Sequence, residues 1–285
     1  MRTKIWPSFL LILIAIPAWA TPAATVTFSR PLAMGEAYRA AGAANGAIYL
    51  NPAGMSRLNM YATELSYMRG ELGGDDDTLH LSIVDTKTQP VGVGVGYSFS
   101  AADVDRHDGR LAASYPLVPD LLYLGGSARY LVLDPESGDN ESALSLDVGW
   151  VVAVGGGLFI GGLVDNAVPD ENIRETTGRE VGGGVGYEGQ RFSLEVNGVY
   201  DPDAGDVDTE SWRRLRWHGG LELMVSGSVS LRGGWTWRPA RDDGAHQASF
   251  GVGYISRSGA IDLAYRPAVD GGGSGTFAVG LRSFM

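Results

Sequence analysis

The amino-acid sequence predicts an all-β protein: a 14-stranded antiparallel transmembrane β-barrel with an N-terminal, partly helical hatch in its lumen. The first observation is strict alternation, which is clearest over residues 91–100, where Val, Tyr and Phe alternate with Gly and Ser. Because successive side chains of a strand point to opposite faces, such a segment has one apolar face and one small or polar face. The second observation is that segments of about ten residues with this pattern recur along the chain, separated by connections that alternate long and short.

Residues 1–20 have the organisation of an export signal. Arg2 and Lys4 carry positive charge, residues 5–16 are mostly apolar, and residues 18–20 (Ala-Trp-Ala) fit an A-x-A cleavage site. A retained membrane anchor is the alternative, but the apolar run is short for a membrane span. We therefore expect an exported protein that resides in the outer membrane of a Gram-negative bacterium and crosses it with strands.

Residues 21–58 are predicted to form the hatch, and residues 59–285 the barrel. The hatch segment does not alternate, and its stretches 31–40 and 43–50 are rich in Ala and interrupted by Gly and Pro, which predicts two short helices. An even strand number is typical of bacterial barrels. The predicted strands are 60–69, 78–85, 91–100, 110–117, 121–132, 143–153, 157–165, 180–188, 191–200, 213–224, 228–238, 247–256, 260–267 and 275–284.

Side-chain parity divides these strands into a lipid-facing set and a lumen-facing set. On the strand at 78–85, for example, the outward set is Leu79, Leu81 and Ile83. A charge that faces lipid at the midplane costs about 2–4 kcal/mol, so charged residues of the opposite parity are expected in the lumen. There, opposite charges can pair across strands. The predicted lumen charge network consists of Glu64, Arg129, Asp147, Arg214, Arg216, Glu222, Arg232, Asp262 and Arg266, and Arg110, Glu195, His218 and Arg282 share its parity.

Connection lengths predict the orientation. If the first strand rises from the periplasm, the long connections are extracellular and the short ones are periplasmic turns. Most of the 33 Asp and Glu residues fall in the long connections, which gives an acidic outer rim and a net charge of −11. Residues 201–208 have the alternating carboxylates of calcium loops, but Trp212 stands where an EF-hand has Glu, so a solvated acidic loop is the alternative. The long connections are expected at 70–77, 101–109, 133–142, 166–179, 201–212, 239–246 and 268–274.

The sequence does not favour an enzyme, and it predicts no cofactor and no metal site. The chain has no Cys, which excludes disulfides and thiol chemistry, and its four His residues are scattered. His80 and Ser82 have the H-x-S spacing of barrel lipid A deacylases, but parity points His80 into the lumen rather than toward lipid. No third orienting group is evident near them in the sequence.

Residues 34–55 resemble the N-terminal signature of FadL-type outer-membrane transporters and the related PorV/PorQ-like proteins. The specific part is the run from Ile48 to Gly54, which ends in Asn-Pro-Ala-Gly; Glu36 stands in place of a second Gly. Residues 162–166 are similar to a strand-end Asn motif of the PorV-like group. The resemblance implies a barrel plugged by a hatch, with hydrophobic molecules captured outside and released through the barrel wall. The residues of the hatch motif are Met34, Gly35, Tyr49, Asn51, Pro52, Ala53 and Gly54.

Two functions follow from this resemblance. The first is passage of a small hydrophobic compound, fatty-acid-like or aromatic, across the outer membrane, with the hatch motif as the moving part. The alternative is a non-transporting accessory or assembly protein of the PorV type that partners a secretion-system protein. The other expected partners are outer-membrane lipid and lipopolysaccharide and a hydrophobic ligand; no nucleic-acid partner is expected.

Overall fold

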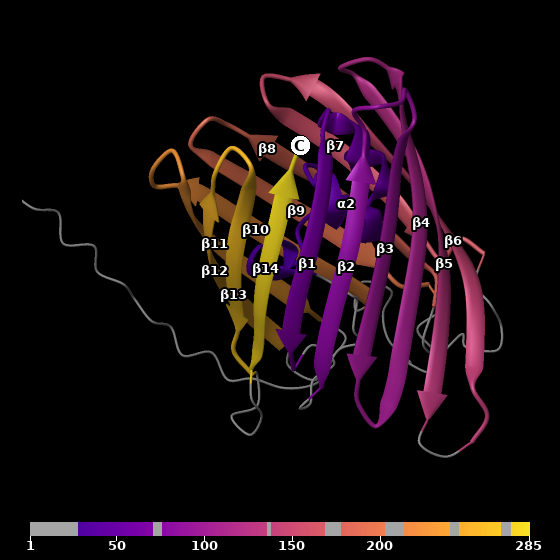
Figure 1. Cartoon of the computed structure of the whole chain (residues 1–285). Helices are drawn as coiled ribbons and strands as arrows, with labels where there is room; N and C mark the ends of the chain where they lie inside the picture. Colours follow the sequence, from indigo (N-terminus) through magenta and orange to yellow (C-terminus); the bar gives the residue numbers. More distant parts are fainter. Residues whose placement is uncertain are drawn as a thin grey trace, which may run out of the picture.

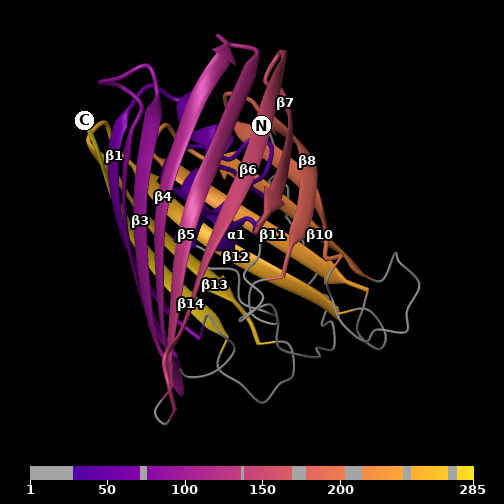
Figure 2. The same cartoon turned by 90° about the vertical axis from the view of Figure 1, so that its right-hand side faces the viewer.

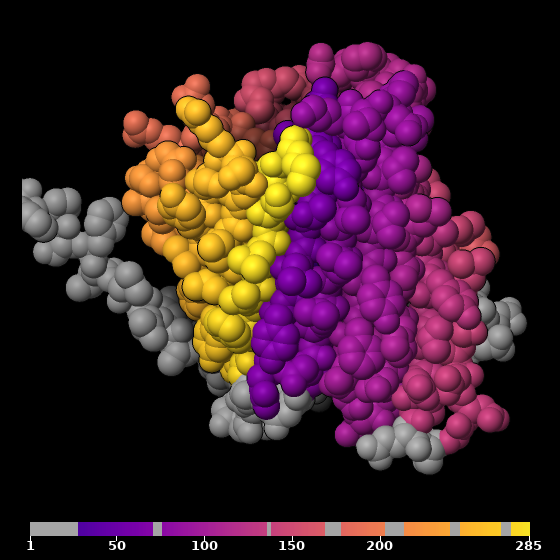
Figure 3. Space-filling model, viewed as in Figure 1, coloured from indigo at the N-terminus to yellow at the C-terminus, as the bar shows by residue number. Residues whose placement is uncertain are grey.

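A computed structural model of the chain describes residues 28–70, 76–135, 138–168, 178–202, 214–239, 245–268 and 275–285. Its strands form one closed antiparallel barrel in which each strand pairs with its neighbours in sequence. The barrel is closed by pairing of β1 (Tyr61–Arg69) with β14 (Thr276–Phe284), which lie side by side in Figures 1 and 3. The predicted all-β class and the predicted count of 14 strands are thus confirmed.

Except for β4, which begins at Val104 rather than at residue 110, the observed strands fall close to the predicted ranges. The remaining twelve are β2 (Asp77–Asp85), β3 (Gly92–Ala101), β4 (Val104–Val118), β5 (Leu122–Pro135), β6 (Glu141–Gly155), β7 (Leu158–Asp165), β8 (Glu180–Glu188), β9 (Phe192–Tyr200), β10 (Leu215–Met224), β11 (Val229–Arg238), β12 (Ala245–Ile255) and β13 (Gly259–Arg266).

Burial alternates along the strands as parity predicts. On β2, Leu81 is 50% exposed, whereas the adjacent His80 is 0% exposed. Large exposed hydrophobic residues follow the same parity on the other strands, and buried charged residues occupy the opposite positions. A sheet that exposes its apolar face and buries its polar face is the reverse of a soluble sandwich, and it is the arrangement of barrels whose outer face meets lipid.

The two ends of the barrel differ in their connections. Short turns join β2 to β3, β4 to β5, β6 to β7, β8 to β9, β10 to β11 and β12 to β13 at one end, which we call the short-turn end (top of Figures 1 and 2). The opposite end carries most of the longer connections and is called the long-loop end. The C-terminus lies at the short-turn end.

The predicted long connection at 101–109 is wrong. β3 ends at Ala101 and β4 begins at Val104, so only two residues join them. Arg106 and Asp108 fall in this predicted connection, but they are inward-facing strand residues and are 8% and 0% exposed. The charged side chains of this segment are therefore buried beside other lumen charges and are not exposed to solvent as loop residues would be.

Residues 28–57 lie inside the barrel, where Figure 1 shows them as indigo coils. They form α1 (Ser29–Ala33), α2 (Ala44–Leu50) and the 3₁₀ helix η1 (Pro52–Arg57). α1 contacts β11 to β14, α2 contacts β1 to β4, and η1 contacts β3 to β6. We call residues 28–57 the lumenal segment. None of the helices among the described residues is long and apolar enough to cross a membrane.

The two helices predicted in this segment are found with different extents. The predicted helix at 43–50 corresponds to α2, whereas the one predicted at 31–40 ends at Ala33. Gly35 and Glu36 have φ angles of 62° and 64°, a left-handed conformation that ends a helix. The predicted export signal at residues 1–20 lies outside the described residues.

Candidate functional site

The lumenal segment is seated on inward-facing glycines of the barrel wall. A Cβ added to Gly125 would lie 2.5 Å from the carbonyl carbon of Pro52, and one added to Gly220 would lie 2.5 Å from the carbonyl oxygen of Met34. A side chain at these positions would therefore collide with the backbone of the segment. Backbone atoms of the segment also lie close to Gly161 and Gly234, and its side-chain atoms lie close to Gly94, Gly96, Gly149, Gly182, Gly186, Gly251 and Gly280.

Asn51 of the hatch motif anchors the segment to the wall. Its Nδ2 donates to the carbonyl oxygens of Arg39 (2.6 Å), Trp150 (3.2 Å) and Gly162 (3.4 Å), and its Oδ1 accepts from the Ala53 amide at 3.2 Å. Trp150 and Gly162 face each other across β6 and β7. Asn51 is 1% exposed. One side chain thus caps η1, holds the preceding turn and contacts two strands.

The other hatch-motif residues are also buried in the lumenal segment. The Gly35 carbonyl oxygen accepts from Thr236 Oγ1 at 3.1 Å and lies 2.8 Å from His218 Nδ1. The Gly35 amide donates to Ser249 Oγ at 3.1 Å. The Arg110 guanidinium lies over the Tyr49 ring, with Arg110 Cζ 4.9 Å from the centre of that ring. The motif therefore contacts opposite parts of the wall through backbone and side-chain groups.

The predicted lumen charge network is resolved into separate clusters, the first of them around Asp108. Its Oδ1 lies 3.2 Å from Arg110 Nε, and its Oδ2 lies 2.8 Å from Arg129 Nε and 3.7 Å from Arg106 Nη2. Arg110 Nη1 also lies 3.5 Å from Asp147 Oδ2. Arg129 thus pairs with Asp108, which sequence reasoning had placed in a loop.

The second cluster joins α1 to β10, β11, β13 and β14. Asp262 lies 2.6 Å from both Arg232 and Arg282, through its two carboxylate oxygens. Glu222 contacts Arg232 and pairs with Arg30 of the lumenal segment at 3.0 Å. The lumenal segment therefore extends the ion pairs of the wall through Arg30. Nothing in the sequence marked Arg30 as a member of this charge cluster. Glu64 faces Arg282 across the β1–β14 pair.

The remaining predicted charges lie elsewhere. Arg266 pairs with Glu36 of the segment at 2.8 Å, and Arg216 pairs with Glu180. Arg214 donates to the Pro202 carbonyl oxygen at 3.1 Å. The one available signal for Glu36 was its position in the hatch motif, where it replaces a glycine.

Glu36 makes the attachment of the segment pH-dependent. Burial alone would raise the pKa of its carboxyl, but the charge of Arg266 and of further wall Arg residues outweighs burial and lowers the pKa from 4.5 to about 2. Because the folded-state pKa is lowered, this stabilisation is present above pH 4.5 and is lost as the pH falls toward 2. The shift corresponds to about 3 kcal/mol.

We expect Glu36→Gln to weaken attachment of the segment at pH 7 and to raise ion conductance in planar bilayers, because the Arg266 guanidinium loses its charged partner. The difference between the variant and the unmodified protein should shrink as the pH falls from 4.5 toward 2, because the stabilisation from the Glu36 charge is lost over that range. Conductance measured between pH 7 and pH 2.5 tests this. A constant difference over that range would contradict the expected role of the Glu36 charge.

His80 and Ser82 each hydrogen-bond to a side chain outside the H-x-S pair. His80 Nδ1 lies 2.6 Å from Ser98 Oγ, and Ser82 Oγ accepts from Asn45 Nδ2 at 2.8 Å. Both side chains point into the lumen, as parity predicts, and each serves packing of the wall or the segment. Within the described ranges no three His, Asp or Glu residues are grouped to hold a metal ion. Most of the acidic stretch 201–208, the possible calcium loop, lies outside the described ranges.

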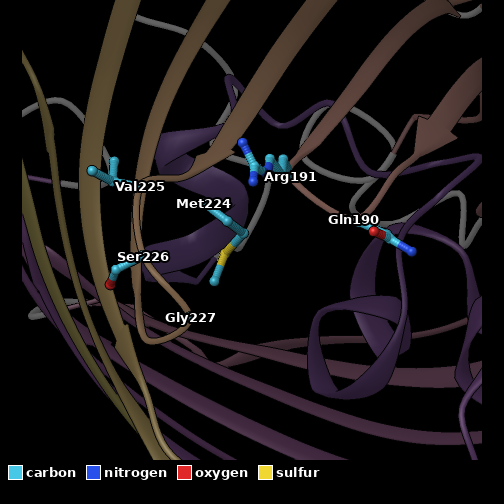
Figure 4. A pocket seen from close by; sticks show the side chains of 6 residues that line it. All are labelled: Gln190, Arg191, Met224, Val225, Ser226 and Gly227. Atoms are coloured by element: carbon cyan, nitrogen blue, oxygen red, sulfur yellow. The ribbon is translucent and has the colours of Figure 1, made fainter.

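A cavity of about 470 Å³ lies at the short-turn end. It is formed by Gln190 and Arg191, between β8 and β9, and by residues 224–227, at the β10–β11 turn. Figure 4 shows Arg191 and Met224 between the two turns. None of the predicted site residues lines this cavity. The contact between the lumenal segment and the wall, not this open cavity, is therefore the candidate functional site.

Comparisons with solved structures show a shared fold. The chain is similar to the monoaromatic hydrocarbon channel CymD, with a TM-score of 0.64, 12% identity, and coverage of 90% of this chain and 97% of that one. It is also similar to the toluene transporters TodX of Pseudomonas putida (TM-score 0.60, 11% identity, 95% and 98% coverage) and TbuX of Ralstonia pickettii (0.59, 12%, 91% and 97%). No protein-family model and no curated protein sequence matches the chain. All three neighbours are named as channels or transporters, and at 11–12% identity the likeness is one of fold.

Proposed function

We propose that this protein is a FadL-type outer-membrane channel that passes a small hydrophobic compound, with the lumenal segment as its hatch. The observation that carries the proposal is a lumen occupied by a buried segment that seats on wall glycines. A pore for polar solutes needs only a water-filled lumen, which such a segment obstructs. A hatch is useful where a compound is held and released in steps.

The similar structures support this class of cargo. CymD is a monoaromatic hydrocarbon channel, and TodX and TbuX are toluene transporters. On this proposal the apolar outer face of the strands meets the lipid of an outer membrane, the long-loop end is extracellular, and the short-turn end is periplasmic. Asn51 links the segment to β6 and β7, so a change at the hatch motif is transmitted to that part of the wall.

Replacing Asn51 by Ala tests the proposal. The change removes the bonds to the Arg39 and Trp150 carbonyl oxygens and the cap of η1, which weakens attachment of the segment by about 1–3 kcal/mol. We expect normal barrel assembly, judged by heat-modifiable gel migration, and several-fold lower toluene uptake by cells that express the variant.

Asn45→Ala is the matched control, because Asn45 is an equally buried Asn of the same segment that bonds to Ser82 of β2 rather than to β6 and β7. We expect it to keep uptake. If Asn51→Ala prevents assembly, the motif is structural; if it changes neither assembly nor uptake, transport loses its support. In that case a PorV-type accessory role, tested by co-purification of a secretion-system protein, becomes the better account.

A further inference from the structure

The cavity at the short-turn end lies between two turns that are joined by the strand ladder. The Met224 amide donates to the Arg191 carbonyl oxygen at 2.8 Å, one step beyond the last register pair of β9 and β10, which is Phe192 with Leu223. Figure 4 shows the Arg191 and Met224 side chains next to each other. The cavity volume of about 470 Å³ falls in the range of roughly 300–1,000 Å³ that is usual for ligand sites. The cavity is therefore large enough to hold a small ligand group.

The lining of this cavity supplies one positive charge and several hydrogen-bond donors. Arg191 carries the charge, and none of the six lining residues is acidic. Ser226 Oγ accepts from the Ser228 amide at 3.3 Å and from the Val229 amide at 3.1 Å, which leaves its hydroxyl hydrogen to donate elsewhere. Gln190 adds an amide group with two N–H donors. This lining favours an anionic ligand.

The carboxylates that precede the two turns are already paired with other Arg residues. Glu188 pairs with Arg57 of the lumenal segment, and Glu222 pairs with one Arg of the segment and one of β11. In the described part of the chain no ion pair includes Arg191. The Arg191 charge is therefore available to a ligand from outside the chain.

The outer face of the same turns marks the level of the membrane interface. Phe192 and Leu223 directly adjoin the cavity residues in sequence, and both are exposed on the outer face of the barrel. The centre of the Phe192 ring lies 5.1 Å from the centre of the Tyr187 ring. Aromatic residues gather at both membrane interfaces of outer-membrane barrels. The cavity therefore lies at the level of lipid headgroups, at the end opposite the long connections.

We propose that this cavity binds the headgroup of an anionic phospholipid, such as phosphatidylglycerol, from the leaflet at the short-turn end. The Arg191 guanidinium donates to two phosphate oxygens, and Ser226 and Gln190 donate to the others. The acyl chains lie along the apolar outer face of β9 and β10. Nothing lies within 4 Å of a Cβ added to Gly227, so the tip of the β10–β11 turn leaves room for the glycerol part to cross the rim.

The lining also predicts which headgroup is preferred. A phosphodiester has one negative charge, which matches the single guanidinium, and more acceptor oxygens than a carboxylate, which matches the three donor side chains. An ammonium group, as in phosphatidylethanolamine, would find no carboxylate among the lining residues. This inference uses the membrane placement of the proposed function, but it is independent of the cargo and of the hatch motif, none of whose residues lines the cavity.

Lipid titration of the purified full-length protein in detergent, followed by native mass spectrometry, tests the site. The probes are phosphatidylglycerol and phosphatidylethanolamine with the same acyl chains, and we expect phosphatidylglycerol to bind more tightly. Arg191→Met should lower the affinity for phosphatidylglycerol by about tenfold, because the phosphate loses its charged partner. Arg257→Met is the matched control, since Arg257 lies in the β12–β13 turn at the same end but does not line the cavity. The control should bind like the unmodified protein.

The outcomes decide whether the site exists and whether it is a lipid site. A preference for phosphatidylglycerol that is lost in Arg191→Met and kept in Arg257→Met supports the proposal. Equal binding of the two lipids, or unchanged affinity in Arg191→Met, overturns it. The free headgroup glycerophosphoglycerol serves as competitor, and displacement of the lipid at equal concentration would assign the cavity to a soluble phosphodiester and overturn the lipid assignment.

Two further measurements keep the result unambiguous. If Arg191→Met does not assemble, Gly227→Asp decides, because a carboxylate at the open turn tip repels the phosphate without removing a contact of the wall; unchanged affinity in this variant would then overturn the proposal. Toluene uptake by cells that express Arg191→Met should equal that of the unmodified protein. Absence of uptake by the unmodified protein would contradict the channel function and leave the lipid site standing.

Discussion

Deletion of residues 28–57 is expected to raise the ion conductance of the barrel in planar bilayers by about tenfold or more, because a filled lumen becomes a polar, water-filled one. The deleted segment covers the inward glycines of nine strands, and its removal uncovers the wall charges Glu222 and Arg266. The wall keeps its own strand pairing, so assembly should survive. Unchanged conductance in an assembled barrel would contradict a plugging role of the segment.

A matched pair of glycines in β11 tests the same point in the complete chain. Gly234 faces inward, and its added Cβ would collide with the Gly35 amide and lie 2.5 Å from the Met34 carbonyl carbon. The adjacent Gly233 faces outward, and nothing lies within 4 Å of its added Cβ. We expect Gly234→Val to displace the segment and raise conductance, and Gly233→Val to leave conductance unchanged. Equal conductance of the two variants would contradict the expected fit of segment to wall.

The strand pattern could be predicted because one physical rule governs every strand. A strand with one face toward lipid and the other toward the lumen must alternate apolar with small or polar residues, as in β2 and β3. This alternation can be recognised in the sequence without knowing which strands pair. The inward parity of Arg232 and Asp262 follows from the same rule. Such positions depend only on the local sequence and on the two environments.

The pairing of charges and the fit of the segment could not be predicted in this way. Asp108 was misplaced because a short run of charged residues looks alike in a solvated loop and on a lumenal face. Arg129 could be placed inward, but its partner depends on register between β4 and β5. The inward position of the wall glycines follows from strand parity, but only the structure shows that atoms of the lumenal segment pack against them. The contacts of Asn51 and Arg39 depend equally on three-dimensional placement.

Replacing Asp108 by Ala is expected to lower the free energy of unfolding of the barrel by about 3–5 kcal/mol, because it leaves buried Arg residues without their carboxylate. Asp108 is 0% exposed, and it is the shared partner of Arg110 and Arg129. Denaturant unfolding from lipid vesicles, followed by tryptophan fluorescence, measures the change. A loss below about 1 kcal/mol would mean that these Arg residues are solvated in the lumen rather than held by Asp108.

Two further variants determine whether charge or volume causes the loss. Asp108→Asn keeps the size of the side chain and one carbonyl oxygen but removes the charge, so it should cost nearly as much as Asp108→Ala. Combining Asp108→Ala with Arg129→Met removes one of the charges left unpaired and should recover part of the stability, because residues in one ion-pair cluster are energetically coupled. Arg110 retains Asp147 at 3.5 Å in this double variant, which limits the remaining cost. Purely additive losses would show that the cluster around Asp108 does not act as a unit.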